Sequence, residues 1–126
     1  MIVADSSYII EALLKDSSML DNYDMIFAPD FGFYEVLNAV WKYQILLKRI
    51  KDGWIILEIF FDLISAERIH FVGLEQETIK NAYELAVRTR MSVYDTAFIV
   101  LAKELKAELK TLDKKQAELF LEASQD

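Results

Sequence analysis

The chain has 126 residues, the size of one ordinary domain, with a hydrophobic fraction of 54% and a formal net charge of −7. It contains no cysteine, which excludes disulfides, thiolate metal sites and cysteine nucleophiles. With His70 as the one histidine, the composition also argues against a His-based zinc site and a Ser-His-Asp triad. A bound metal would therefore be held by carboxylates, which favour hard ions such as Mg²⁺ or Mn²⁺. The negative charge opposes simple adhesion to nucleic acid, so an enzyme acting on nucleic acid would need metal ions or a local basic patch.

The first half of the chain alternates apolar strand patterns with helical ones. Residues 2–4 form a short apolar strand that ends at Asp5, and a helical pattern follows Ser6 and Ser7. Residues 25–28 form a second strand, stopped by Pro29. Asp30 then caps a long helix over about 31–50, and Asp52-Gly53 marks its break.

The second half continues the alternation with a helix over about 54–66 and a strand at 69–72, in which His70 is structural. Helices over about 75–89 and 93–107, a weak strand at 108–111 and a helix at 114–122 complete the pattern. With 3 glycines and 1 proline, no stretch reads as a linker, so we expect a single domain over 1–126. The alternation predicts an α/β fold, a three-layer α/β/α sandwich around a mostly parallel central sheet.

Acidic residues stand where such a fold places its chemistry. Ligands of open parallel sheets bind outside the carboxyl ends of the strands. Asp5 directly follows the first strand and Asp113 the last. Each acid also has a plain structural alternative as the N-terminal cap of the helix that follows it.

Two further acids stand inside or at the start of predicted helices. Asp95 lies three residues after Ser92, a spacing that resembles a capping box. Glu35 lies inside the long helix, where capping does not explain it, and shares a face with Asn38 and Lys42. That face is either an ordinary solvated stripe or the lining of a cleft.

The four acids and their neighbours form an ordered set of motifs along nearly the whole chain. The motifs are Asp5-Ser6-Ser7, Glu35-Val36-Leu37-Asn38, Tyr94-Asp95-Thr96-Ala97 and Thr111-Leu112-Asp113. In order and approximate spacing this set resembles the PIN-domain ribonucleases, in particular the VapC-type toxins of toxin–antitoxin pairs.

The resemblance implies a metal-dependent endoribonuclease that hydrolyses RNA phosphodiester bonds. Asp5, Glu35, Asp95 and Asp113 would converge and hold one or two Mg²⁺ or Mn²⁺ ions, which activate water and stabilise charge on the phosphodiester. Supporting hydrogen bonds would come from Ser7 and Thr111, which orient carboxylates, and from Asn38, which holds Glu35 or touches substrate.

This chain departs from the family pattern around its last strand. Family members often carry Leu-Gly-Ala before that strand and Thr-Ala-Asp after it. Here the segments read Leu105-Lys106-Ala107 and Thr111-Leu112-Asp113. The position of Asp113 is therefore the one that the missing glycine affects most.

Basic and apolar surface residues suggest partners. Arg88, Arg90, Lys114 and Lys115 lie near Asp95 or Asp113 in sequence and either contact RNA phosphates or are solvated surface. Residues 45–64 are apolar on more than one face, which indicates either a well-filled monomer core or a covered surface. The resemblance implies a homodimer and an antitoxin protein bound in an apolar groove. No signal peptide or membrane span is visible, so we expect a cytoplasmic protein with no membrane contact.

Three other classes of protein compete with the nuclease. A catalytically inactive PIN-like protein-interaction module suits the negative charge and the apolar surface, although the complete set of acids argues against it. A phosphoacceptor receiver domain needs paired acids after its first strand, and a haloacid-dehalogenase-type phosphatase needs Asp-x-Asp. Asp5 is followed by two serines, which excludes both patterns.

Overall fold

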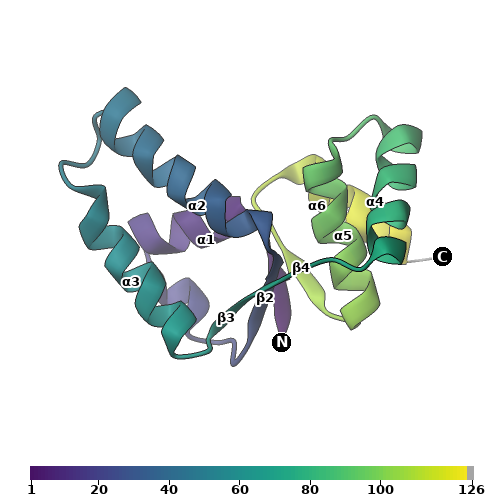
Figure 1. Cartoon of the computed structure of the whole chain (residues 1–126), viewed down its shortest axis with the longest axis horizontal. Helices are drawn as coiled ribbons and strands as arrows, with labels where there is room; N and C mark the ends of the chain where they lie inside the picture. Colours follow the sequence, from purple (N-terminus) through teal and green to yellow (C-terminus); the bar gives the residue numbers. More distant parts are fainter. Residues whose placement is uncertain (125–126) are drawn as a thin grey trace.

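The computed structural model describes residues 1–124 and places a parallel sheet between two groups of helices (Figure 1). The strands are β1 (Ile2–Ala4), β2 (Ile26–Pro29), β3 (Ile69–Val72) and β4 (Glu108–Lys110). The helices are α1 (Ser6–Leu14), α2 (Phe31–Trp41), α3 (Gly53–Ser65), α4 (Gln76–Thr89), α5 (Val93–Leu105) and α6 (Lys114–Ser124). A short 3₁₀ helix, η1 (Ser17–Leu20), follows α1, and a π-helical turn, η2 (Lys42–Leu46), extends α2.

The sheet has the strand order β3-β2-β1-β4, and every neighbouring pair is parallel. All carboxyl ends therefore lie at one edge. From β1 the chain adds β2 and β3 on one side, and then returns to add β4 on the other side of β1. The crevice between β1 and β4 is thus a topological switch point, where ligands of such sheets bind.

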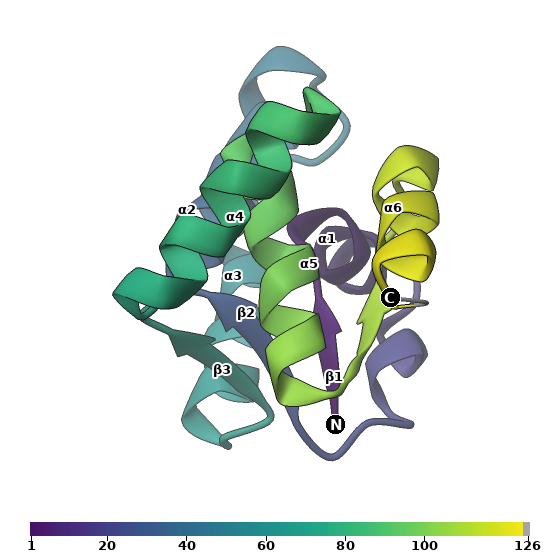
Figure 2. The same ribbon diagram turned by 90° about the vertical axis from the view of Figure 1, so that its right-hand side faces the viewer.

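Each face of the sheet carries its own apolar core, as expected of strands whose side chains alternate between faces. Val3 of β1 packs with Ala28 and the buried side of α5. Ile2 and Ala4 point the other way and pack against α1, α2 and α3. Figure 2 shows α4 and α5 crossing the face of the sheet opposite to α1, α2 and α3. The predicted three-layer α/β/α arrangement is confirmed.

The predicted continuous helix over 31–50 is wrong at its C-terminal end. The α-helix ends at Trp41, the next turn is the π-turn η2, and no helix covers 47–50. Lys48 adopts a left-handed conformation with φ of 51°, which ends helices. In addition, the side chain of Gln44 accepts a hydrogen bond from the backbone N–H of Gly53 at 2.8 Å.

Gly53 is required by this close approach at the start of α3. A Cβ at this position would lie 2.7 Å from Val40 Cγ1 and 2.9 Å from Gln44 Oε1, too close for any other residue without movement. The side chain of Asp52 accepts from the backbone N–H of Trp54 at 3.0 Å and caps the helix. The remaining helices begin and end within about two residues of their predicted limits.

The end of α5 shows what replaces the glycine that the family often carries there. Lys106 adopts a left-handed conformation with φ of 54°, and the N–H of Ala107 bonds to the carbonyl of Ala102. A lysine can adopt the glycine conformation at a cost of about 1 kcal/mol. The last strand still pairs with β1 over its whole length, with Val3 opposite Leu109. The missing glycine therefore does not displace β4.

No helix within residues 1–124 is long and apolar enough to cross a membrane.

Candidate active site

Asp5 stands at the switch point of the sheet. It follows β1, and its backbone N–H donates to the carbonyl of Lys110 in β4 at 3.0 Å. Its side chain is buried, with 7% exposed. One carboxylate oxygen accepts from the Ser7 hydroxyl at 2.6 Å and from the backbone N–H of Tyr8 at 3.1 Å; the other accepts from the Thr111 hydroxyl at 2.8 Å. Asp5 is therefore both the cap of α1 and a carboxylate held in one orientation.

Burial raises the pKa of Asp5 above its ordinary value. The hydrogen bonds from Ser7, Thr111 and the Tyr8 backbone lower that pKa in part, and the negative charge of Asp95 raises it again. The carboxylate is thus kept where its negative charge is unfavourable, which is the condition that a bound cation relieves.

Glu35 approaches from the face of the sheet covered by α2. It is half-buried, and its Oε1 accepts from the Ser6 hydroxyl at 2.7 Å. Burial raises its pKa, the Ser6 hydrogen bond lowers it, and the charges of Asp5 and Asp95 raise it further. Glu35 is therefore part of an acid cluster, not of a solvated stripe, whereas its predicted neighbour Asn38 is exposed on the helix.

Asp95 brings the third charge from the opposite face of the sheet, in the first turn of α5. Ser92 caps that helix, since its hydroxyl accepts from the backbone N–H of Asp95 at 3.2 Å. The charge of Asp95 acts on both Asp5 and Glu35. We call Asp5, Glu35 and Asp95 the acid cluster. The two ion pairs seen in residues 1–124, Lys15–Glu11 and Lys110–Glu108, involve none of its members.

Asp113, the fourth predicted acid, has a different environment. It is exposed, and its Oδ1 accepts from the backbone N–H of Gln116 at 3.0 Å, so it caps α6. The structure thus brings Asp5, Glu35 and Asp95 together and leaves Asp113 beside them as a helix cap. A metal-binding role for Asp113 remains a prediction.

Two residues with contacts at the site are absent from the sequence prediction. Ser6, next to the predicted Ser7, holds Glu35, while Ser7 and Thr111 hold Asp5. Gln116 is fully buried and bonds to both Thr111 and the backbone of Asp95. The spacing Asp113-x-x-Gln116 resembles a capping box. That signal places Gln116 in the first turn of a helix but does not show that its side chain turns inward.

The acid cluster fits a hard divalent cation by its chemistry. Its donors are carboxylate oxygens, and within residues 1–124 no ion pair offsets their negative charges. Across residues 1–124, no three acidic or histidine side chains already surround one point closely enough to hold an ion. Mg²⁺ does not require that, because it keeps several waters and is usually held by one or two carboxylates.

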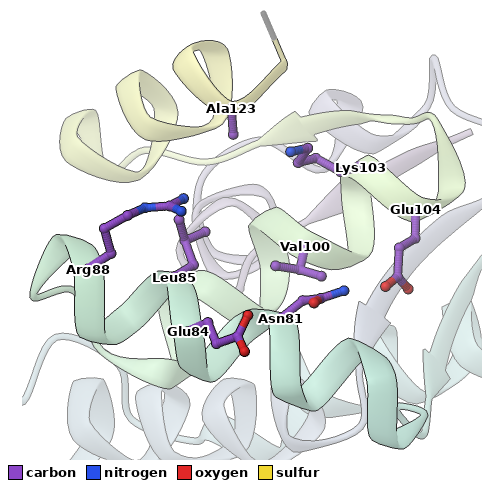
Figure 3. A pocket seen from close by; sticks show the side chains of 8 residues that line it. All are labelled: Asn81, Glu84, Leu85, Arg88, Val100, Lys103, Glu104 and Ala123. Atoms are coloured by element: carbon purple, nitrogen blue, oxygen red, sulfur yellow. The ribbon is translucent and has the colours of Figure 1, made fainter. Parts of the chain in front are cut away.

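The predicted RNA-contacting residues are all exposed. Arg90 ends α4 in a left-handed conformation, and Lys114 and Lys115 lie in the first turn of α6. Arg88 lines a groove of about 340 Å³ between α4, α5 and α6, together with Glu84, Lys103 and Glu104 (Figure 3). The groove carries charges of both signs, so it is no simple phosphate site. RNA contact by these residues remains a prediction.

A doubly wound parallel α/β sheet with an acid cluster at its switch point defines the class of this protein. The sequence model of the PIN domain matches residues 2–120, and the chain belongs to that family. It is 34% identical over 92 residues to Ribonuclease VapC3 of Pyrobaculum aerophilum, an alignment that covers 72% of this chain and 68% of the relative. The resemblance to VapC-type ribonucleases is therefore confirmed.

A solved structure confirms the fold. The crystal structure of PAE2754 from Pyrobaculum aerophilum aligns with a TM-score of 0.66, covering 99% of this chain and 97% of that one. The two sequences are 16% identical over this match, so it supports the architecture and carries no statement about activity.

Proposed function

We propose that this protein is a metal-dependent endoribonuclease that hydrolyses RNA phosphodiester bonds, and that residues 1–126 act as one PIN-like nuclease domain. The observation that carries the proposal is the acid cluster. Asp5, directly after β1, lies near Glu35 of α2 and Asp95 of α5 at the carboxyl edge of the sheet. The charge of Asp95 raises the pKa of both other acids, and the charge of Asp5 raises that of Glu35. None of the three forms an ion pair within residues 1–124. Placing like charges close together lowers the stability of the folded protein. Such unfavourable arrangements of ionisable groups cluster at functional sites, and a bound cation would relieve this one.

In this proposal Asp5, Glu35 and Asp95 hold Mg²⁺ or Mn²⁺, with Asp113 as a fourth, more distant contributor. When bound, the metal lowers the pKa of a coordinated water and offsets charge on the scissile phosphate. The residues of the chain orient the site. Ser7 and Thr111 hold both oxygens of Asp5, and the Ser6 hydroxyl holds one oxygen of Glu35.

We further propose that the protein is the toxin of a VapBC-type toxin–antitoxin pair, that it forms a homodimer, and that its antitoxin occupies an apolar groove. Two observations support this: the similarity to Ribonuclease VapC3, and the solvent-exposed apolar side chains on η2 and α3. Their exposed fractions are 59% for Leu46, 56% for Trp54 and 61% for Ile55. The alternative of a well-filled monomer core does not account for these residues, because a core would bury them.

The competing function is a catalytically inactive PIN-like protein-interaction module. The apolar surface and the net charge of −7 suit it. It gives no reason for a buried Asp5 and a half-buried Glu35, whose pKa values are both raised by burial and by the charge of Asp95. A binding scaffold is more stable with amides at these positions, so the acids favour the nuclease.

The test is cleavage of a broad panel of single-stranded and structured RNAs with Mg²⁺ or Mn²⁺, with and without chelator. We expect cleavage that stops on chelation and that falls by orders of magnitude in Glu35→Gln. The matched control is Glu11→Gln, which removes an acid of α1 that pairs with Lys15 outside the cluster. Metal-independent cleavage, or none on any RNA under several metals, would contradict the proposal; the second result would favour the scaffold.

A further inference from the structure

Gln116 is a polar side chain with no exposed surface, in the first turn of α6. Burying an amide is unfavourable unless its hydrogen bonds are made, and an apolar side chain would fill the position without that requirement. The two side-chain partners of Gln116, the Thr111 hydroxyl and the Asp95 carbonyl, both lead to the acid cluster. We propose that Gln116 is a positioning residue of this cluster, which sets the distance between Asp5 and Asp95; the inference rests on the proposed metal-dependent function.

The first link runs through Thr111. The Thr111 oxygen lies 2.7 Å from Gln116 Oε1 and 2.8 Å from Asp5 Oδ2, and it accepts from the backbone N–H of Asp113 at 3.0 Å. These three neighbours fix where the Thr111 oxygen lies, while its one proton can point to either of the two acceptors. Gln116 therefore holds the segment after β4 at the place from which Thr111 reaches Asp5.

The second link reaches the opposite side of the site. Gln116 Nε2 donates to the backbone carbonyl of Asp95 at 3.0 Å, at the first turn of α5. This bond also settles the orientation of the amide, because the carbonyl of Asp95 can only accept. Gln116 thus joins Asp95, on one face of the sheet, to Thr111 and Asp5 at its edge.

Asp5 and Gln116 share the hydroxyl proton of Thr111. Thr111 has one hydroxyl proton and two neighbouring acceptors, Asp5 Oδ2 and Gln116 Oε1. The proton can serve only one of them at a time. Gln116 and Asp5 are therefore coupled through one hydroxyl, so a change at Gln116 is felt at Asp5 without any direct contact.

The experiment replaces Gln116 with methionine, which has a similar length and volume but neither donates nor accepts as an amide does. Gln116→Leu is the second variant if the first does not fold. The primary measurement needs no RNA: it is the Mn²⁺ concentration that gives half of the maximal gain in melting temperature. We expect that concentration to rise about 10-fold or more, as for other residues that orient metal ligands. In cleavage assays kcat should fall while KM for RNA stays unchanged, because Gln116 is buried away from substrate.

Thr78→Val is the matched control. Thr78 is also a buried polar residue, and its hydroxyl donates to Glu104 at 2.7 Å, away from the acid cluster. The Thr78→Val variant should lose about as much stability as Gln116→Met, while its Mn²⁺ midpoint stays that of the wild type. If Gln116→Met behaves in the same way as this control, Gln116 is a structural residue and the proposal is overturned.

Thr111→Val tests whether Gln116 acts on Asp5 through the Thr111 hydroxyl. The combined effect of Thr111→Val and Gln116→Met on the Mn²⁺ midpoint should be smaller than the product of the single effects, because both changes break one link. Multiplied effects would overturn the coupling through Thr111. A wild-type protein that neither responds to Mn²⁺ nor cleaves RNA would instead refute the proposed function, and this proposal with it.

Discussion

The Ser92 hydroxyl oxygen accepts a hydrogen bond from the backbone N–H of Asp95 at 3.2 Å, so the serine caps α5 and the side chain of the acid is not needed for that purpose. The sequence left capping and metal binding open for Asp95. The geometry separates them, because the capping bond uses the backbone of Asp95 and the serine oxygen. The two functions can therefore be removed one at a time.

The first prediction uses this separation. Ser92→Ala should cost about 1 kcal/mol of stability, the usual value of a lost N-cap, and leave the response to Mn²⁺ unchanged. Asp95→Asn should leave the metal-free protein equally or more stable, because it removes one repulsive charge. It should also shrink the Mn²⁺-dependent gain in melting temperature and lower RNA cleavage by orders of magnitude. Thermal unfolding of both variants with chelator and with Mn²⁺ measures this; full activity in Asp95→Asn would contradict a metal site there.

The second prediction concerns the pH dependence of stability. Burial raises the pKa of Asp5 above its ordinary value of 3.8, so the folded protein keeps this proton at pH values where the unfolded chain has lost it. The free energy of unfolding should fall as the pH rises from 3.8 through the folded-state pKa, and stay lower above it.

Asp5→Asn should remove this fall in the free energy of unfolding with rising pH. The new amide can still cap α1 through its oxygen and can donate to Thr111, whose proton then serves Gln116. In chelator and near neutral pH the variant should be more stable than the wild type, and its advantage should vanish below pH 3.8. Urea unfolding at several pH values measures this, with Asp62→Asn on the exposed side of α3 as the control. An advantage that persists in acid would show that charge is not the cause.

The third prediction tests Ser6. Its hydrogen bond to Glu35 lowers the pKa of that acid, so Ser6→Ala should raise the pKa further and leave the carboxylate free to turn. We expect activity to fall by about 10-fold or more and the acidic limb of the pH–rate profile to move to higher pH. Ser6→Thr restores the hydroxyl and should recover most of the rate. Equal rates in the alanine and threonine variants would argue against the positioning of Glu35 by this bond.

Much of the fold follows from sequence because its signals are local. Apolar runs of three or four residues alternate with helical periodicity, and Pro29 and Asp30 mark the change from β2 to α2. The end of α2 could not be predicted in this way. Residues up to 50 continue a helical pattern, and the structure departs from it through a tertiary contact between Gln44 and Gly53 and a left-handed Lys48.

Asp5 and Glu35 stand out as candidate acids for a similar reason. Of the residues that hold them, Ser7 and Thr111 were predicted, whereas Ser6 and Gln116 were not. Asp5 can be picked out because it directly follows a predicted strand. Glu35 can be picked out because it lies inside a predicted helix, where capping does not explain an acid. Ser6 and Ser7 are adjacent in sequence, yet one holds Glu35 and the other Asp5. Which serine faces which acid depends on how α2 packs on α1. The inward orientation of the Gln116 side chain depends on how α6 packs against α5, and no local sequence pattern predicts that packing.

The fourth prediction concerns assembly. The exposed apolar side chains on η2 and α3 predict a homodimer or a partner complex. Light scattering during gel filtration should show a mass above that of one chain, and Ile55→Glu should reduce it. Ile79→Glu is the control, since Ile79 is 50% exposed on α4, on the other side of the sheet. A soluble monomer at high concentration, or a dimer broken only by the control, would contradict the assignment of this surface.

The last prediction asks whether Asp113 binds metal or only caps α6. Its Oδ1 accepts from the backbone N–H of Gln116, and its own N–H donates to Thr111. Asp113→Asn keeps the cap, because asparagine caps about as well as aspartate. If Asp113 acts mainly as a cap, this variant should retain most of the activity and of the Mn²⁺ response, with a small loss because one nearby negative charge is gone.

Asp113→Ala separates the two roles further. It removes the cap, so it should lose about 1 kcal/mol of stability, and it loosens the segment that carries Thr111, so activity should fall more than in Asp113→Asn. A metal ligand behaves differently: the asparagine and alanine variants would then be equally inactive, because neither carries the charge. Comparing the two variants by RNA cleavage and by Mn²⁺-dependent melting decides the matter. Since Asp113 is exposed and its carboxylate caps α6, we expect the order wild type, asparagine, alanine, and a milder loss than in Asp95→Asn.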